Sequence, residues 1–255
     1  MSVKLPGFLH PRFNLIGHRG VHSLAPENTL ASFRLAAQLG LNWIEFDTQP
    51  TKDEEWVVIH DATCQRTTNG KGLISELNFA EIRTLDAGSW FSYEFKEEKI
   101  PTLQEVITLG RTCDLQLNIE VKLEPEIILA ETAFNSFIAI LKEYLSPLYP
   151  PPLISSFNID FLKRLKTRMP ELALGLLVEH FSLEAVELVE QFSFSTLNCS
   201  HGTFTPQNLE YLHSKQIPTL LFTVNDLETA HFWIEKGIYA LFTDVPQLLL
   251  PHLRF

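Results

Sequence analysis

Charged and histidine side chains gather in three segments of the sequence, each at the end of an apolar run typical of a buried strand. These segments are His18-Arg19-Gly20, Glu45-Phe46-Asp47 and Glu120-Val121-Lys122. Residues two apart in a strand project from the same face, so Glu45 and Asp47 should point together. Carboxylates buried close together repel one another unless a cation holds them. We therefore predict that Glu45, Asp47 and Glu120 bind a metal ion.

The expected ligands are all carboxylate oxygens, and the set contains no cysteine. Mg²⁺ and Ca²⁺ prefer oxygen ligands, whereas Zn²⁺ commonly takes nitrogen and sulfur. The sequence therefore predicts one divalent hard cation, Mg²⁺ or Ca²⁺, and does not distinguish the two. The alternative interpretation is that Glu45 and Asp47 belong to a solvated strand face and that Glu120 pairs only with Lys122.

Two histidines also follow apolar runs. His18 comes after Leu15-Ile16-Gly17, and His60 comes after Val57-Val58-Ile59, so each is expected where a buried strand emerges into the site. A single histidine at such a position is usually a hydrogen-bonded structural residue. Because histidine exchanges protons near neutral pH, two of them at one site fit a general acid and a general base.

Arg19 and Lys122 add positive charge beside the predicted metal ligands. An arginine can hold a phosphate group through two hydrogen bonds, and cations stabilise the charge that develops in phosphoryl transfer. We expect both residues to bind a substrate phosphate. Pairing with Glu45 or Glu120 is their alternative role, and the two roles are compatible.

Composition limits the partners of this chain of 255 residues. The net charge of −11 argues against a nucleic acid partner, because such binding depends on many lysines and arginines. Cys64, Cys113 and Cys199 form no Cys-x-x-Cys pair, which fits a reducing compartment. Residues 1–11 have no long apolar core of a signal peptide, and no run reaches about 20 apolar residues. We therefore expect a cytoplasmic protein without stable membrane insertion; its oligomeric state is not predicted.

The elements that position these residues alternate between strands and helices. The expected strands are residues 15–18, 43–49, 115–122, 153–157, 172–179, 195–200, 218–224 and 239–243. The expected helices are residues 27–40, 103–111, 126–145, 159–168, 183–191, 206–215, 226–237 and 246–250. This order predicts an α/β fold and favours a closed (β/α)8 TIM barrel over a doubly wound open sheet. The length fits one barrel domain over residues 1–255.

One segment interrupts the alternation. Residues 56–60 form an apolar run that follows residue 47 after only a short polar stretch, too short for a parallel crossover, so we predict an antiparallel ninth strand. Residues 61–99 then read as an insertion after the second strand and its hairpin. It contains a turn at 67–70, a helical stretch at 76–85 and the stretch 88–95, and we expect it to lie over the strand C-termini.

Taken together, the motifs resemble those of the glycerophosphodiester phosphodiesterase family and span nearly the whole chain. They include His18-Arg19-Gly20, Pro26-Glu27-Asn28-Thr29, Glu45-x-Asp47, His60-Asp61, Arg66-Thr67-Thr68-Asn69-Gly70, Ile100-Pro101-Thr102-Leu103, Glu120-x-Lys122, Ser156-Phe157, Thr223-Val224-Asn225-Asp226 and Thr243-Asp244-x-Pro246. Two positions depart from the pattern, since many relatives have glycine at Glu54 and tryptophan at Phe222. Neither departure removes a group with a predicted role in catalysis.

The resemblance implies a (β/α)8 barrel with a small insertion and a metal-dependent hydrolase of glycerophosphodiesters. Its products would be sn-glycerol 3-phosphate and an alcohol such as choline or ethanolamine, which places the enzyme in glycerol and lipid metabolism. It also implies the roles already assigned to the metal ligands, the histidine pair and the two cations. Phe222 and Asn198, at the ends of two later strands, are expected to line the pocket. Which histidine is the base, and whether water or a substrate hydroxyl attacks, stays open.

Two other functions are compatible with the same residues. A related phosphodiesterase could act on lysophospholipids at a membrane, in a phospholipase D-like reaction. Such an enzyme should expose the insertion aromatics Trp90, Phe91, Tyr93 and Phe95, which would otherwise form the core of the insertion. A catalytically silent barrel that only binds a phosphorylated ligand is the other alternative. It would be expected to lack one of the histidines or acidic ligands, and none is missing.

Overall fold

A closed barrel of parallel strands forms the centre of the protein. The computed structural model describes residues 14–123, 128–144 and 150–253. The barrel strands are β1 (Asn14–Gly17), β2 (Trp43–Pro50), β4 (Gln116–Val121), β5 (Leu153–Ser156), β6 (Ala173–Val178), β7 (Thr196–Ser200), β8 (Thr219–Phe222) and β9 (Ala240–Thr243). Because β1 pairs in parallel with both β2 and β9, the sheet closes on itself. The predicted barrel is therefore confirmed over the open sheet.

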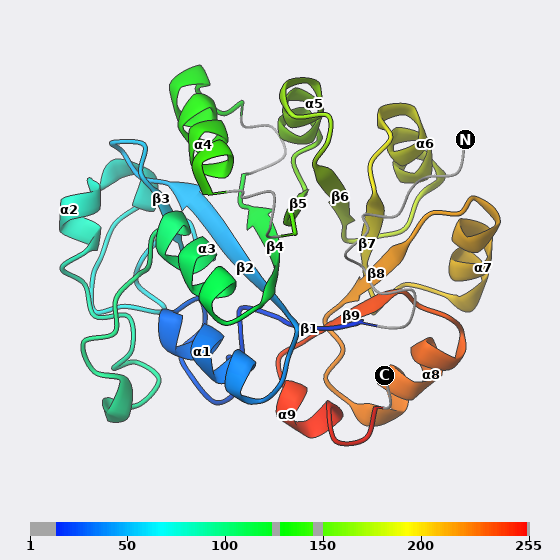
Figure 1. Ribbon diagram of the computed structural model, residues 1–255, viewed down its shortest axis with the longest axis horizontal. Helices are drawn as coiled ribbons and strands as arrows, with labels where there is room; N and C mark the ends of the chain where they lie inside the picture. Colours follow the sequence, from blue (N-terminus) through cyan, green and yellow to red (C-terminus); the bar gives the residue numbers. More distant parts are fainter. Residues whose placement is uncertain (1–13, 124–127, 145–149, 254–255) are drawn as a thin grey trace.

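Helices surround the strands, as Figure 1 shows. They are α1 (Leu30–Gln38), α3 (Leu103–Thr112), α4 (Glu131–Tyr144), α5 (Ile159–Arg168), α6 (Leu183–Phe192), α7 (Pro206–Ser214), α8 (Leu227–Glu235) and α9 (Pro246–Leu249). Side-chain caps begin several of them; Thr102 and Glu105, for example, form a reciprocal capping box at the start of α3. Residues 126, 127 and 145 of the helix expected over residues 126–145 lie outside the described residues.

The first helix begins later than expected. We predicted a start at residue 27, but α1 begins at Leu30, with the hydroxyl of Thr29 accepting a hydrogen bond from the backbone N–H of Ser32. The physical reason is that Asn28 has a left-handed backbone, with φ of 58°, which cannot continue a right-handed helix. Residues 27 and 28 thus belong to a loop whose side chains turn toward the barrel mouth.

Apolar side chains pack on both faces of the barrel wall. Inside the barrel, a separate cluster comprises Ile16, Trp43, Leu153, Ala173, Leu220, Ala240 and Phe242. The larger core fills the space between the strands and the surrounding helices. Alternate residues of each strand face the barrel interior. The inward-facing residues that follow this apolar layer along the strands lie nearer the C-terminal ends, and several of them are polar.

The predicted antiparallel strand is present, but shorter than expected. β3 (Trp56–Val58) pairs with β2, and the chain leaves the sheet before His60. Trp56 anchors this hairpin on α4: its indole N–H donates to Ser136 Oγ at 3.0 Å, and its ring lies 4.8 Å from that of Phe137. The amide of Gln49 donates to the carbonyls of Ile59 and Asp61 and so holds the chain on either side of His60.

The insertion contains only short helical segments. These are η1 (Ile74–Glu76), α2 (Phe79–Ile82) and η2 (Tyr93–Phe95). The expectation of one helix over residues 76–85 is wrong, because Asn78 and Glu81 form a capping box that starts a new helix after η1. Phe91 and Phe95 are half-buried and do not belong to the insertion core. That core instead comprises Val57, Ile59, Cys64, Ile74, Ile82, Ala87 and Ile100.

The insertion lies beside the barrel rather than across it. In Figure 1 it extends to the left of β3 and α1, next to the C-terminal end of β2. The expectation that the insertion lies over the strand C-termini is therefore wrong for most of the strands, because it lies next to the end of β2 alone. Its apolar side chains pack against β3, so they hold it at one side of the mouth.

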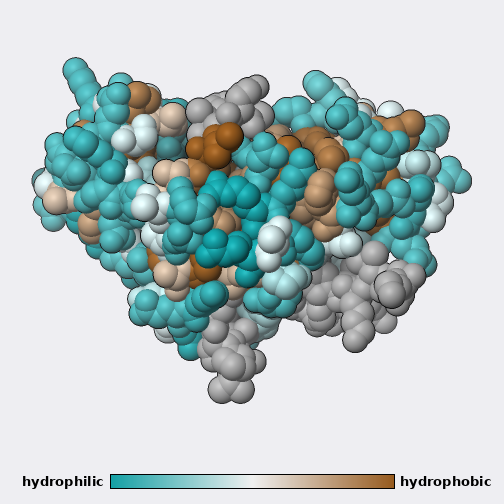
Figure 2. All heavy atoms as spheres, turned by 90° about the horizontal axis from the view of Figure 1, so that it is seen from above, coloured by the Kyte–Doolittle hydropathy of each residue, from teal (hydrophilic) through white to brown (hydrophobic). Residues whose placement is uncertain are grey.

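Hydrophilic side chains cover most of the molecular face in Figure 2, with smaller apolar areas between them. Ion pairs link neighbouring helices at the surface: Glu131 of α4 lies 2.7 Å from Arg164 and 3.2 Å from Arg168, both in α5. Within the described ranges, the helices fall short of the length and apolar character needed to cross a bilayer.

Candidate active site

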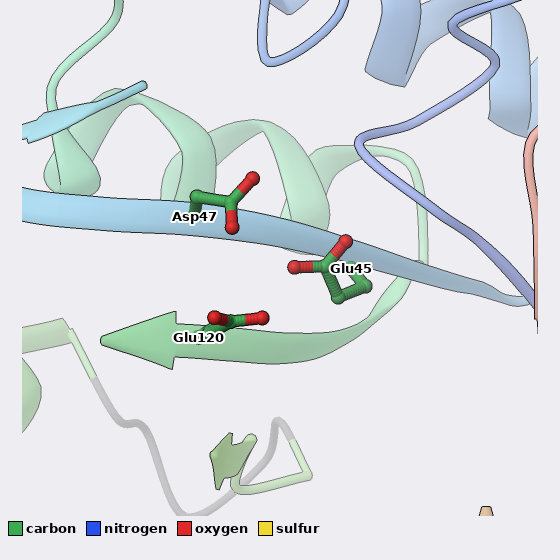
Figure 3. Close-up of side chains that lie close together, drawn as sticks. All are labelled: Glu45, Asp47 and Glu120. Carbon is green, nitrogen blue, oxygen red and sulfur yellow. The ribbon is translucent and has the colours of Figure 1, made fainter. Parts of the chain in front are cut away.

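Three carboxylates meet at the barrel mouth. Glu45 and Asp47 come from β2 and Glu120 from the adjacent β4, where Asp47 and Glu120 are paired residues of the two strands. Figure 3 shows the three side chains grouped together. Each offers an oxygen within 4.8 Å of the others, and the three residues are only 2%, 1% and 8% exposed. The structure thus brings together the three predicted metal ligands.

The electrostatics of this cluster fit a bound cation. Burial and repulsion from Asp47 and Glu120 raise the pKa of Glu45 well above its usual range, and burial raises that of Glu120 to about 7. Glu45 Oε1 is buried and has no hydrogen-bond partner in the part of the chain that the structure describes. A buried acceptor of this kind costs free energy unless a donor or an ion meets it. A hard divalent cation would satisfy the free oxygen and relieve the repulsion, so the donor set fits Mg²⁺ or Ca²⁺.

Arg19 lies in a tight turn after β1. Its φ is 55°, and this left-handed conformation directs its backbone N–H to Glu45 Oε2 at 3.0 Å. Gly20 follows with φ of 86°, and a Cβ there would lie 2.3 Å from Ser32 Oγ, so only glycine fits. The Arg19 guanidinium reaches Glu27 at 2.8 Å and Asp47 at 3.4 Å. This turn therefore places the positively charged guanidinium group of Arg19 directly beside the carboxylate cluster.

The loop before α1 contributes two residues to which sequence reasoning assigned no role. The Asn28 amide donates to Asp47 Oδ2 at 2.9 Å, and its carbonyl oxygen accepts from the Asp47 backbone N–H at 3.2 Å. Glu27 is 7% exposed and accepts hydrogen bonds from both Arg19 and Arg66. Both belong to the quoted Pro26–Thr29 motif, which was the available signal for them.

Lys122 lies on the other side of the cluster. Its Nζ is 2.8 Å from Glu120 and 3.9 Å from Asp47. Burial alone would lower the pKa of Lys122, but these carboxylates raise it, so the side chain stays charged. The ammonium group also lies 5.7 Å from the ring centre of Phe157. Arg19 and Lys122 thus flank the three carboxylates, each paired with acidic groups.

His60 is held by a chain of charged side chains that reaches the insertion. Its Nδ1 lies 2.8 Å from Asp61 Oδ1, and Arg66 binds both oxygens of Asp61 and both oxygens of Glu27. Burial lowers the pKa of His60, although Asp47 and Asp61 act in the opposite direction. The neutral imidazole is therefore favoured near pH 7. Sequence reasoning assigned no role to Arg66, which was quoted only within a motif.

His18 is held by a different carboxylate. Its Nδ1 lies 2.6 Å from Asp244 Oδ1, and its Nε2 lies 3.9 Å from Glu45 Oε2. His22 shares the same Asp244 oxygen at 3.2 Å. Asp244 directly follows β9, so its place at the end of a barrel strand was a signal that could have identified it.

The expected pocket residues lie in different settings. Phe222 is half-buried and packs edge-to-face against Phe157, with 6.0 Å between ring centres. Asn198 is fully buried; it accepts a hydrogen bond from Thr196, while its Nδ2 has no partner among the described residues. It therefore lies below the surface of the mouth. Their role in lining a substrate pocket stays a prediction.

Comparison with known proteins identifies relatives over most of the chain. The profile of the "Glycerophosphoryl diester phosphodiesterase family" matches residues 18–248. A glycerophosphodiester phosphodiesterase of Caldanaerobacter subterraneus subsp. tengcongensis is 35% identical, covering 94% of this chain and 97% of its own length. A Thermotoga maritima glycerophosphodiester phosphodiesterase structure is 26% identical, with a TM-score of 0.74 and coverage of 95% and 99% of the two chains.

A closer structural match is an Oleispira antarctica phosphodiesterase in complex with the product sn-glycerol-3-phosphate. It is 35% identical, has a TM-score of 0.89, and covers 93% of this chain and 95% of its own. These matches confirm the expected barrel and the expected class of enzyme. With the family profile extending from His18 to α9, the chain belongs to the glycerophosphoryl diester phosphodiesterase family.

Proposed function

We propose that the chain hydrolyses glycerophosphodiesters to sn-glycerol 3-phosphate and an alcohol at the C-terminal mouth of the barrel. Membership of the family supports this activity, as does the product bound to the Oleispira antarctica relative. The observation that carries the assignment to this site is the buried cluster of Glu45, Asp47 and Glu120, with oxygens within 4.8 Å of one another. It is flanked by two histidines, each hydrogen-bonded to a carboxylate.

In this proposal, Glu45, Asp47 and Glu120 hold one divalent cation, either Mg²⁺ or Ca²⁺. When bound there, the ion would supply Lewis acidity to the phosphate oxygens and offset negative charge in the transition state. Asn28 supports the arrangement, because its two hydrogen bonds fix the orientation of Asp47. Oxygen donors of this kind suit hard cations, and both candidate ions accept them.

Arg19 and Lys122 bind the substrate phosphate from two sides. Each is already paired with buried carboxylates, Arg19 with Glu27 and Lys122 with Glu120, which fix the positions of the cations before substrate arrives. Preorganised charges stabilise a transition state without reorganisation during the reaction. The two ion pairs therefore support the predicted phosphate-binding role instead of replacing it.

His18 and His60 exchange the two protons that the reaction requires. One takes a proton from the attacking hydroxyl, and the other gives a proton to the oxygen of the leaving alcohol. The attacking group is water, or a hydroxyl of the glycerol moiety that forms a cyclic phosphate first. Both routes need one base and one acid at the phosphate, so the histidine pair serves either.

Release of glycerol 3-phosphate from glycerophosphocholine tests this function. The wild-type protein is assayed after chelation and again after adding Mg²⁺ or Ca²⁺ back separately. We expect activity to be lost with chelator and restored by at least one of the two ions. Full activity in the chelated protein would reject the metal-dependent hydrolysis, and no release under any condition would reject the substrate.

Lysophospholipid hydrolysis is a second candidate, supported by exposed aromatic side chains on the insertion. Tyr93 is 78% exposed and Trp90 is 40% exposed, whereas Phe91 and Phe95 are half-buried and pack edge-to-face at 5.7 Å. Exposed aromatic rings favour the interface between water and lipid. Release of choline or lysophosphatidic acid from lysophosphatidylcholine micelles, lost in a Trp90→Ser/Tyr93→Ser double variant, would support this candidate.

We propose that residues 1–255 form one domain, with the insertion at about residues 61–99. A cytoplasmic enzyme in glycerol and lipid metabolism fits the substrate class and the free thiols of Cys64, Cys113 and Cys199. The excess of acidic residues does not suit nucleic acid binding.

A further inference from the structure

The hydrogen bond between His18 and Asp244 determines how the His18 ring is presented. An ionised carboxylate can only accept hydrogen bonds, so the Nδ1 atom 2.6 Å away must carry a proton. Burial acts to raise the pKa of Asp244. Hydrogen bonds from His18, His22 and Asn225 nevertheless hold this pKa well below its usual range. Asp244 therefore stays ionised, and a neutral His18 has its lone pair on Nε2, the atom nearest the carboxylate cluster.

Asp244 is itself fixed by a partner on another loop. The Asn225 amide donates to Asp244 Oδ2 at 2.6 Å, and the Asn225 carbonyl oxygen accepts from the Asp244 backbone N–H at 2.8 Å. Thr243 also donates to that oxygen at 3.2 Å. The direction of these hydrogen bonds is determined, because only the Asn225 nitrogen can donate to the carboxylate. Oδ1 is thus left for His18 and His22.

The two histidine–carboxylate pairs differ in their surroundings. Asp61, the partner of His60, is bound through both oxygens by Arg66, so a permanent cation already balances its charge. Among the described residues, Asp244 accepts hydrogen bonds only from His18, His22, Asn225 and Ser23, the last at its backbone oxygen. His18 therefore depends on Asp244 for orientation without a competing arginine.

We propose that Asp244 is a positioning residue that holds His18 with Nδ1 protonated and Nε2 directed into the site. The proposal rests on the proposed function, in which His18 is one of the two proton-exchanging groups. It also assigns a role to Asn225, which directs Oδ1 of Asp244 to His18 by binding Oδ2. Loss of the correct tautomer should lower turnover while leaving substrate binding by Arg19 and Lys122 largely intact.

Asp244→Asn tests this with nearly the same shape. If the oxygen of the new amide accepts from Asn225, its NH2 group faces His18 Nδ1 and forces the wrong tautomer. If it turns around, its NH2 group meets the NH2 group of Asn225. We expect kcat to fall about 10²- to 10⁴-fold, with KM changed less than about threefold. A kcat near that of wild type would overturn the proposal. Asp160→Asn, an exposed carboxylate on α5, is the matched control that should keep wild-type activity.

A compensating variant separates positioning from general damage to the fold. In the double variant Asp244→Asn/Asn225→Asp, the carboxylate at position 225 accepts from the amide at 244, whose oxygen again accepts from His18. We expect this double variant to recover at least about tenfold of the kcat lost in Asp244→Asn. A double variant no more active than Asp244→Asn, although folded by circular dichroism, would contradict the assigned role of Asn225 and Asp244.

Imidazole ¹⁵N NMR gives a readout that does not depend on activity. The His18 signals, assigned by their loss in His18→Gln, should show a protonated Nδ1 in the neutral ring of the wild type and a shift toward protonated Nε2 in Asp244→Asn. Protonated Nε2 in the neutral wild-type ring would overturn the positioning role. If the tautomer changes as expected but no glycerophosphodiester is hydrolysed by any variant or by wild type, the proposed function fails while the orientation of His18 by Asp244 is supported.

Discussion

Replacing Glu45 with glutamine should lower the stability of the metal-bound protein without lowering that of the metal-free protein. Glu45 is 2% exposed, and burial, Asp47 and Glu120 raise its pKa well above the usual range. Without metal, a neutral side chain at this position relieves repulsion among the three carboxylates. We therefore expect Glu45→Gln to unfold at the same temperature as wild type in chelator, or at a higher one.

With metal bound, Glu45→Gln should unfold at a lower temperature than wild type. A ligand at 100 times its dissociation constant stabilises a folded protein by about 2.7 kcal/mol. For a chain of this size, that corresponds to a rise in Tm of about 5–11 °C. If loss of one anionic ligand weakens binding about 100-fold, the same metal concentration stabilises Glu45→Gln by only about 0.4 kcal/mol, or about 1 °C.

Thermal unfolding followed by circular dichroism measures both parts, in chelator and in a titration with Mg²⁺ or Ca²⁺. Glu210→Gln, on the exposed face of α7, is the control and should keep the full metal-induced shift. Equal metal-induced shifts in wild type and Glu45→Gln would contradict the role of Glu45 as a metal ligand. So would the absence of any shift in wild type with either ion, because the cluster would then not be a cation site.

Three further substitutions test the surrounding structure. Phe137→Ala, at a fully buried position of α4, should lower the free energy of unfolding by about 3–5 kcal/mol in urea denaturation; a loss below about 1 kcal/mol would contradict its place in the core. Glu27→Ala should cost about 2 kcal/mol by the same assay and also reduce activity, because Arg66 loses a bidentate partner; unchanged stability would show that this ion pair contributes nothing. Burial acts to raise the pKa of Glu105, but Arg83 holds this pKa below its usual value in the folded protein. The contribution of the ionised Glu105 to folding stability is therefore fully present above about pH 5 and is lost as the pH falls further. The Tm difference between wild type and Glu105→Gln should therefore shrink between about pH 5 and pH 3, and a difference independent of pH would contradict the pairing.

The sequence predicted the barrel and the meeting of the acidic ligands because both follow from periodicity. In a barrel of alternating strands and helices, the C-terminal ends of the strands surround one mouth. The sequence alone therefore predicted that Glu45, Asp47 and Glu120 lie close together. The short polar link after β2 likewise predicted the antiparallel β3, since a parallel crossover needs more residues.

Features that depend on loop conformation were missed. The predicted start of the first helix at residue 27 was wrong because Asn28 has a left-handed backbone, and no periodic pattern reveals such a conformation. Glu27 and Arg66 meet across 39 positions of sequence, and only the path of the insertion brings them together. The position of Asp244 directly after a barrel strand could have identified it as a site residue. That it is the partner of His18 could be recognised only from the 2.6 Å contact.

Steady-state kinetics of two single alanine variants tests whether His18 and His60 carry out catalysis as a pair. Glycerol 3-phosphate release is measured under saturating glycerophosphocholine and the activating metal, with metal binding checked by the thermal shift of each variant. We expect His18→Ala and His60→Ala each to lose at least about 10²-fold in kcat while keeping the metal-induced rise in Tm. A metal-bound variant of either histidine that turns over substrate at the wild-type rate would contradict catalysis by the pair.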